Sequence, residues 1–259
     1  MLRNLRELYL YRGLLLSLTQ RELKARYRGS VLGFLWTFLN PTMQMIVYSL
    51  LFSVWMRQQI EHYTYFVFIG LLPWIWFSSS VGGGASAISD RRDLLTKVRF
   101  PAQVLPATVV TTNLINFLLS LPLLFVLGLI FGRYPSWHLV FFPLVVFVQL
   151  WVTLALVYLF SAINVRFRDL QHILGNVLTM WFFVTPIFYR ADSIPEKFRD
   201  IVLLANPMAV MATSYQAIFY DHRVPAMGPL ALWVGIAVVL LWLASSVFES
   251  RREEFAEVV

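Results

Sequence analysis

Cysteine is absent from the sequence, which excludes a disulfide framework and a thiolate metal site. Charge is scarce as well, since 14% of the 259 residues are charged, against roughly a quarter in an ordinary soluble domain. No G-x-x-x-x-G-K-S/T phosphate-binding loop occurs, and the glycine-rich stretch VGGGAS at 81–86 has no lysine after it. We therefore expect this chain to have no catalytic site, no ATP hydrolysis of its own, and no bound cofactor or metal.

The sequence is instead rich in apolar residues, which make up 59% of it and indicate an integral membrane protein. Six runs lack Asp, Glu, Lys and Arg and reach the roughly 17 to 25 residues that a helix needs to cross a bilayer. These runs are 31–56, 64–88, 104–131, 139–163, 170–189 and 229–248. We predict an all-α membrane domain over 31–248 with six spans, preceded by a cytoplasmic segment (1–30) and followed by a cytoplasmic tail (249–259).

The distribution of basic residues predicts the orientation of these spans. Segments 1–30, 89–103, 164–169 and 249–259 carry 7, 4, 2 and 2 of the 21 Lys and Arg residues, which is 15 of them. Because Lys and Arg in short loops stay on the cytoplasmic side, both termini are predicted to be cytoplasmic. The net charge of +7 then indicates contact with anionic membrane lipids or an acidic partner, not with nucleic acid. A secretory signal peptide is not expected, because the first apolar run, 14–16, is too short.

The segment before the first predicted span has the pattern of an amphipathic helix lying in the membrane surface. Its apolar stripe consists of Leu8, Tyr11, Leu15 and Leu18. Glu22 and Arg26 have the i,i+4 spacing of a favourable ion pair, and Gly29 stands where a glycine would end the helix. A solvated basic face that only fixes the topology remains an alternative.

A short charged insert, SDRRDLLTKVRFPAQ, occupies residues 89–103 between the second and third predicted spans. Ser89 or Asp90 is suited to cap a short helix, and Pro101 prevents its continuation. A bare connection between two spans needs only a few residues. The insert is therefore interpreted either as a knob that docks into a partner or as a positive-inside loop that happens to be helical.

Neutral polar and aromatic residues inside the predicted spans are candidates for a carbohydrate path. Asn40 and Pro41 interrupt the first span, where a proline frees a carbonyl and an amide side chain is costly against lipid. Aromatic residues make up 16% of the chain and offer stacking surfaces for sugar rings, although aromatic belts at the membrane interfaces are an alternative. Polar side chains in the spans also serve as glue between helices. The candidate channel residues are Trp36, Asn40, Pro41, Gln44, Tyr48, Asn176 and Trp181.

The outer connection between the fifth and sixth predicted spans contains IVLLANPMAVMATSYQAIF at 201–219. A seventh span here would place Arg251 and Arg252 outside, against the charge rule. We therefore predict two short helices that dip into the outer membrane face, broken at Asn206 and Pro207. Within 195–221 the candidate outer gate residues are Asn206, Pro207, Tyr215 and Phe219. A surface loop without a gating role is the alternative.

Two sequence stretches carry a resemblance to a known family. RELKARYRGSVLGFLWTFLNP at 21–41, followed by the insert ending in KVRFPAQVLP at 97–106, resembles the membrane subunits of ABC-2 type exporters. The resemblance covers nearly the whole chain and is strongest to the O-antigen, capsule and teichoic-acid polysaccharide exporters (Wzm-type). It implies a homodimer that binds two copies of a cytoplasmic ATPase using Mg-ATP and exports a lipid-linked polysaccharide across the cytoplasmic (inner) membrane.

The resemblance also implies roles for particular residues. The insert becomes the coupling helix that seats in the ATPase, with contacts from Arg91, Arg92, Asp93, Leu94, Leu95, Lys97 and Arg99. The N-terminal helix becomes an interface helix beside the same ATPase, through Arg21, Glu22, Lys24, Arg26 and Arg28. Residues 195–221 become gate helices. The same superfamily also contains exporters of lipids and drugs, which the sequence does not separate from polymer exporters.

Functions from other classes fit the sequence less well. A secondary transporter or ion channel ordinarily places a carboxylate, His or Arg within the membrane, whereas the predicted spans hold only His172, near an end. An intramembrane enzyme needs acid, base or metal-binding groups gathered at one site. The outer acidic residues show no paired spacing; they are Glu61, Asp192, Glu196, Asp200 and Asp221.

Overall fold

The computed structural model describes residues 2–57, 59–91 and 100–250. Regular structure in this part of the chain is helical throughout. The longer helices are α1 (Leu2–Leu10), α2 (Arg12–Tyr27), α3 (Trp36–Ser49), α4 (Tyr63–Ser86), α6 (Val104–Ile130), α7 (Phe142–Asn164), α8 (Leu170–Val184), α9 (Glu196–Ala205), α10 (Pro207–Phe219) and α11 (Met227–Ser250). A π-helical turn continues α3, and short 3-10 turns precede α3, α7 and α9 and follow α4; they are Leu50–Trp55, Gly33–Leu35, Trp137–Phe141, Ala191–Ser193 and Ser89–Arg91.

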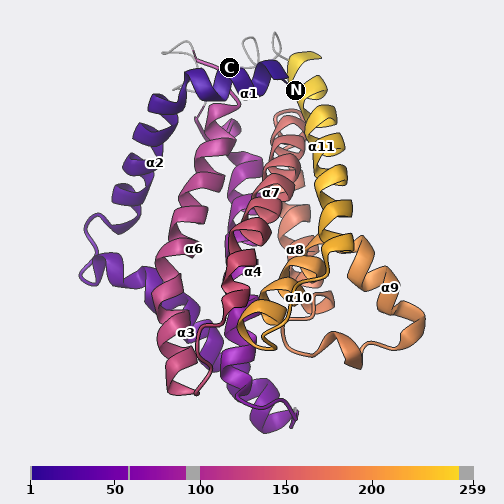
Figure 1. Ribbon diagram of the computed structural model, residues 1–259. Coiled ribbons are helices and arrows are strands. Elements are labelled where there is room, and N and C mark those ends of the chain that lie inside the picture. The colour runs from indigo at the N-terminus through magenta and orange to yellow at the C-terminus, as the bar shows by residue number, and fades with distance from the viewer. Residues whose placement is uncertain (1, 58, 92–99, 251–259) are drawn as a thin grey trace.

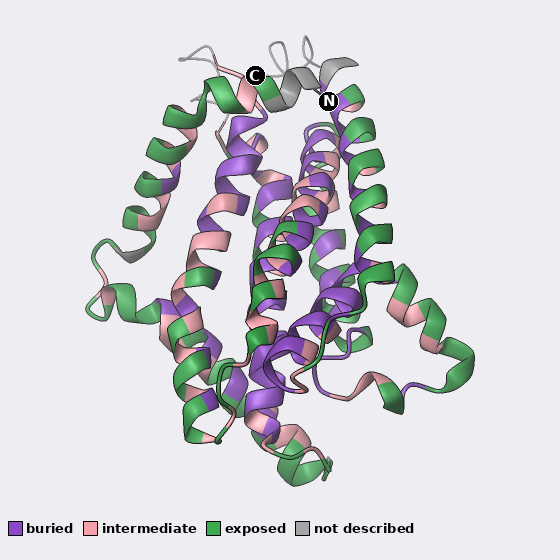
Figure 2. Cartoon of the chain, viewed as in Figure 1, coloured by how far each residue is buried: buried purple, intermediate pink, exposed green. Residues whose placement is uncertain are grey.

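The long helices form an upright bundle with α4 at its centre (Figure 1). α4 packs against α3, α6, α7, α8 and α10, and α11 packs against α7. In its most apolar stretch, 72% of the residues of α4 are buried inside the protein, and Figure 2 shows it almost wholly buried while α2 and α11 expose much of their outer faces. α1 and the end of α11 lie at one end of the bundle, and α9 and α10 lie towards the other.

Within the described part of the chain, four helices are long and apolar enough to cross a membrane: Tyr63–Ser86, Val104–Ile130, Trp137–Asn164 and Met227–Phe248. These match the second, third, fourth and sixth predicted spans within a few residues. The bent pair α9 and α10 brings the number to at most five among the described residues if it counts as one span. The all-helical membrane fold is therefore confirmed, with four to five candidate spans.

The other two predicted runs form shorter helices. Residues 31–35 precede α3, whose α-helical part is 14 residues long before it passes into the π turn at Leu50–Trp55. α8 ends after 15 residues, roughly 22 Å at 1.5 Å per residue. It stops at Val184 because Thr185 is extended and Pro186 follows, a conformation that the residue before a proline prefers.

The segment before the first predicted span, 1–30, does not form one continuous helix in the part that the structure describes. α1 lies across the end of the bundle, the chain turns at Tyr11, and α2 then runs along the bundle beside α6. Tyr11, predicted on the apolar stripe, lies at this break and is 37% exposed, whereas Leu15 and Leu18 pack against core clusters. Gly29 ends α2 with a positive φ of 77°, as its position predicts.

Gly84 lets α4 and α7 approach closely, because a Cβ at this position would lie 2.4 Å from Cγ1 of Val157. We expect Gly84→Ala to destabilise the protein by about 1–3 kcal/mol, the usual effect of overpacking a filled core. Val157→Ala removes both clashing methyl groups and leaves Cβ at 3.4 Å, so the double variant should recover most of the loss. Thermal unfolding in detergent measures this, and additive effects of the two substitutions would contradict the close approach.

Candidate functional site

A cavity of about 440 Å³ lies among the end of α2, α3, α4 and α6. Four of the seven predicted channel residues line it, Trp36, Asn40, Pro41 and Gln44, all from α3. The remaining lining residues are Arg26, Ser30, Thr37, Leu72, Ile75, Trp76, Ser79, Asn113, Asn116, Phe117 and Ser120. The structure therefore brings Asn40 and Pro41 of α3 to a mostly neutral pocket within this chain that is rich in hydroxyl and amide groups.

The local structure around Pro41 explains how α3 accepts a proline in its interior. Proline has no N–H, so the carbonyl of Thr37, four residues earlier, loses its helical donor. Ser120 Oγ of α6 donates to that carbonyl at 3.4 Å. At the start of α3, Ser30 Oγ accepts from Gly33 N at 3.2 Å and Trp36 Nε1 at 3.1 Å. Hydrogen bonds of this kind fix α3 against α6 and orient the Trp36 ring.

Arg26 reaches the cavity from the end of α2, where its Nη2 donates to Oδ1 of Asn113 on α6 at 3.4 Å. The predicted pair between Glu22 and Arg26 is not formed. Glu22 Oε2 instead lies 3.0 Å from Nη2 of Arg91, because packing α2 beside α6 brings Glu22 to the segment that follows α4. This ion pair links α2 to Arg91, at the start of the predicted coupling insert.

The remaining insert residues, Arg92, Asp93, Leu94, Leu95, Lys97 and Arg99, lie outside the described residues. The residues just before them are described: Ser89–Arg91 forms a 3-10 turn, and Asp90 Oδ2 accepts from Ser86 Oγ at 2.6 Å. Arg21, Lys24 and Arg28 are exposed along α2 and its end. Glu22 alone of the predicted interface group is in an ion pair among the described residues.

Tyr48 and Trp181, two further predicted channel residues, belong to an aromatic cluster that joins α3, α4, α8 and the segment after α8. The Tyr48 ring lies 5.0 Å from Phe188 and 5.4 Å from Phe182, and Trp181 lies 5.2 Å from Phe77. Phe52 stacks on Phe188 at 4.5 Å. Asn176 lies apart from this cluster, on an exposed face of α8.

Asn206 connects three segments at the predicted outer gate. Its Oδ1 accepts from Met208 N at 2.9 Å and Ala209 N at 3.1 Å, which caps α10. The same atom accepts from Trp181 Nε1 at 2.7 Å, and Nδ2 donates to Thr185 Oγ1 at 3.2 Å. α9 and α10 meet here at 95°. The predicted break is thus present, and the asparagine ties it to the end of α8.

The other predicted gate residues are buried within the chain. Pro207 is the first residue of α10. Tyr215 is 1% exposed and Phe219 6% exposed, and both rings pack against Phe142 of α7. Tyr215 and Phe219 therefore pack α10 against α7, and Phe219 also lines a small pocket beside Tyr65 and Phe125.

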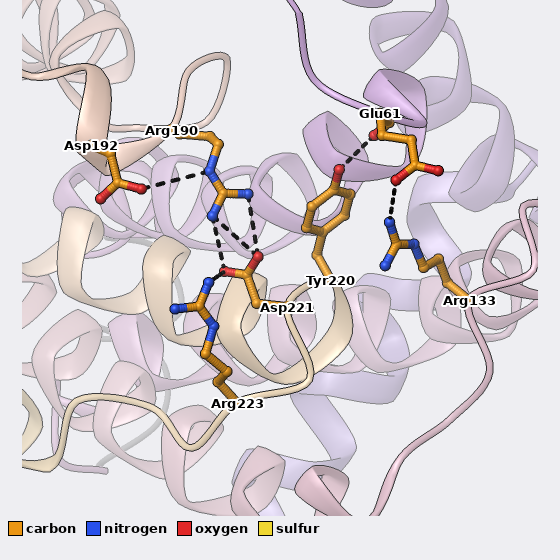
Figure 3. Close-up of polar contacts among 7 residues, drawn as sticks. All are labelled: Glu61, Arg133, Arg190, Asp192, Tyr220, Asp221 and Arg223. Carbon is orange, nitrogen blue, oxygen red and sulfur yellow. Dashed lines mark hydrogen bonds and ion pairs between the residues drawn. The ribbon is translucent and has the colours of Figure 1, made fainter.

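A charged cluster at the end of the bundle away from α1 was missed by sequence reasoning (Figure 3). Glu61 Oε2 accepts from Arg133 Nη2 at 2.9 Å, and Arg133 lies over the Tyr220 ring at 4.8 Å. Tyr220 Oη donates to the Glu61 carbonyl at 2.6 Å. Burial raises the pKa of the Tyr220 phenol, so this group remains a donor at neutral pH.

The same cluster continues through Asp221, whose carboxylate lies 3.2 Å from Arg190 and 3.6 Å from Arg223. Arg190 is also 3.8 Å from Asp192. Exposed ion pairs contribute at most about 1 kcal/mol each, but together these connect the loops that follow α3, α6, α8 and α10. The members come from separate loops, so spacing along the chain gave no sign of the cluster.

These features define the class: a polytopic α-helical membrane protein with a neutral polar cavity within its helical bundle. The ABC-2 type transporter model matches residues 13–220, most of the chain. The chain belongs to the ABC-2 type transporter family. Its relatives are named as permease or transport proteins.

Relatives from three organisms cover almost the whole chain. One, the "O-antigen export system permease protein RfbA" of Myxococcus xanthus, is 66% identical over 260 residues and covers 100% of both chains. A protein of the same name from Klebsiella pneumoniae is 32% identical over 247 residues, with 95% of each chain covered. The "Polysialic acid transport protein KpsM" of Escherichia coli is 24% identical over 247 residues, covering 90% of this chain and 91% of its own.

Proposed function

We propose that this chain is the channel-forming subunit of an exporter that moves a lipid-linked, O-antigen-type polysaccharide across the cytoplasmic membrane. The main support is the 66% identity, over the full length of both chains, to a protein named as an O-antigen export permease. The chain works as a homodimer with two copies of a cytoplasmic ATPase, which supplies Mg-ATP hydrolysis. The cavity supports this substrate class, because its amides and hydroxyls can form hydrogen bonds with sugar hydroxyls and its tryptophans can stack on sugar rings.

The proposed topology has six spans and both termini in the cytoplasm. α3 with its π continuation serves as the first span, and α8 with the segment to Tyr189 as the fifth. Support comes from the basic residues, 15 of 21 in the four inner segments. It also comes from the fold, since α1 and the end of α11 lie at the same end of the bundle as the residues flanking the insert.

The proposed dimer places the exposed faces of α3 and α8 towards the partner protomer and the channel. Both faces carry large exposed apolar side chains, among them Met43 and Val47 on α3, Val54 on the π turn that continues it, and Ile173, Val177 and Met180 on α8. Asn176 and Gln44 are exposed on the same helices. Exposing an amide side chain to lipid costs free energy, whereas contact with protein or a glycan satisfies its hydrogen bonds. This surface is therefore better suited to face the partner protomer or a water-filled channel than lipid.

Coupling to the ATPase is assigned to residues 91–99 and to α2. The ion pair between Glu22 and Arg91 supports a common movement of the two segments. α9 and α10 form the outer gate, bent at Asn206, and the buried positions of Tyr215 and Phe219 correspond to a closed gate.

The proposal is tested by purifying the chain from native membranes in mild detergent, beside a variant carrying Arg91→Glu, Arg92→Glu and Lys97→Glu. We expect a P-loop ATPase in equal amount with the wild type and little or none with the variant, because reversed charges oppose a surface that binds basic residues. Export should be lost, while membrane insertion stays intact. Absence of an ATPase from an intact wild-type dimer would favour a self-sufficient channel or transporter.

A further inference from the structure

The cavity among α2, α3, α4 and α6 is lined largely by neutral polar side chains and by a single positive charge among the described residues. Neutral polar side chains come from α3, α4, α6 and the segment between α2 and α3, with amides from Asn40, Gln44, Asn113 and Asn116 and hydroxyls from Ser30, Thr37, Ser79 and Ser120. Amides and hydroxyls both donate and accept hydrogen bonds. Such a lining fits the hydroxyl groups of a polyol or sugar better than a wholly apolar molecule.

One cation stands beside these neutral groups. Among the described residues that line the cavity, Arg26 alone is ionisable. Its acidic neighbour on α2, Glu22, is directed to Arg91, and the hydrogen-bond partner of the guanidinium is the neutral Oδ1 of Asn113, itself 5% exposed. The guanidinium has five donors and binds phosphate oxygens in pairs. Its placement therefore favours an anion, and phosphate in particular.

Two tryptophans and a flank of exposed apolar residues complete the site. Trp76 is 1% exposed, lines the cavity, and its Nε1 has no acceptor among the described residues. The Trp36 indole lies at the exposed side and is held by Ser30. Beside it, Phe34, Leu35 and Met43 are 47%, 55% and 58% exposed. A ligand with a polar headgroup and an acyl or prenyl chain would fit here: the headgroup would contact the polar cavity, and the chain would contact Phe34, Leu35 and Met43.

We propose that this cavity binds a phosphorylated, hydroxyl-bearing headgroup carried on a lipid, with the phosphate at Arg26 and the hydroxyls at the α3 and α6 amides. Two sources share this chemistry: the phosphate-linked end of the transported glycolipid and an anionic membrane phospholipid. The inference rests on the proposed function only for the first source. The site lies within one chain and shares no residue with the aromatic cluster, whereas Gln44 and Met43 also belong to the exposed face of α3.

The test is equilibrium binding to the full-length protein in mild detergent. The probes are a short-chain prenyl diphosphate bearing one sugar, phosphatidylglycerol, the same prenyl sugar without phosphate, and inorganic phosphate. Saturable binding of the prenyl diphosphate sugar alone identifies the transported glycolipid as the source, and binding of phosphatidylglycerol as well identifies membrane lipid. Equal binding of the phosphate-free probe, or binding of none, overturns the proposal.

Three variants make the result specific to Arg26. Arg26→Gln should weaken binding of the phosphorylated lipid by roughly tenfold or more, the loss expected when a charge-assisted hydrogen bond is removed. Lys24→Gln removes the same charge from an exposed position on the same helix outside the cavity and should leave binding unchanged. Asn113→Asp keeps the contact between α2 and α6 but pairs the guanidinium with a carboxylate, so it should also lose phosphate binding even if Arg26→Gln fails to fold.

Wild-type affinity in both Arg26→Gln and Asn113→Asp, or an equal loss in Lys24→Gln, would overturn the site. Co-purification of the ATPase gives an independent reading in the same preparations. If the ATPase stays bound and no phosphorylated lipid binds, this inference alone fails. If the lipid binds and no ATPase is present, the exporter proposal fails while the cavity keeps its ligand.

Discussion

Glu22→Arg is expected to abolish export while the protein still inserts into the membrane. The substitution replaces the 3.0 Å attraction between Glu22 and Arg91 with repulsion between two cations at the same place. α2 and the start of the insert would then separate. A movement of the ATPase that shifts one of these segments would no longer shift the other. Glycan export and ATP hydrolysis, measured in the same cells and membranes, should therefore become uncoupled.

The reversed pair is the sharp test of this prediction. Glu22→Arg combined with Arg91→Glu restores opposite charges at the two positions and should export more than either single variant, while any direct contact between Arg91 and the ATPase stays lost. Gln20→Arg is the matched control, because it adds a cation to an exposed position on α2 and should have little effect. If Glu22→Arg exports normally, or if the double variant is no better than the single ones, the ion pair has no part in coupling.

Asn206→Leu is expected to destabilise the outer corner of the protein by about 2–4 kcal/mol. Loss of a helix cap accounts for roughly 1 kcal/mol, and the Trp181 Nε1 donor left without its 2.7 Å acceptor accounts for a further 1–3 kcal/mol. The junction of α8, α9 and α10 would loosen, so we also expect the surface near Tyr189 to become more accessible. Thermal unfolding in detergent and limited proteolysis measure the two effects.

Asn206→Ser separates the two contributions. A serine at this position keeps a good cap for α10 but is too short to hold both Trp181 and Thr185, so it should lose roughly half as much stability as leucine. Equal losses for serine and leucine would mean that the cap contributes little. A leucine variant as stable as the wild type would show that the hydrogen bonds of Asn206 do not hold the corner together.

Much of the fold could be predicted because local signals dominate where lipid is the solvent. Uninterrupted apolar runs predicted α4, α6, α7 and α11 within a few residues. Gly29 predicted the end of α2, and the Asn206–Pro207 pair predicted the bend between α9 and α10. The candidate channel residues of α3 were predicted by the same reasoning, since an amide and a proline in a span need protein partners. Asn40 and Pro41 do line the cavity.

Long-range partners could not be predicted from spacing along the chain. Helical spacing paired Glu22 with Arg26, but packing α2 against α6 gave each a different partner, Arg91 and Asn113. The break at Tyr11 has no proline at the junction, so the stripe appeared continuous. The outer cluster around Tyr220 joins residues from separate loops, and only the three-dimensional fold brings their charges together.

The central claim, that this chain carries a lipid-linked polysaccharide out of the cytoplasm, is tested most directly by deleting it in its native cell and locating the glycan on each side of the membrane. The account predicts that surface glycan disappears, that lipid-linked glycan accumulates on the cytoplasmic side, and that the wild-type chain but not the charge-reversed insert variant restores the surface. Unchanged surface glycan in the deletion strain, with no inner accumulation, would contradict it.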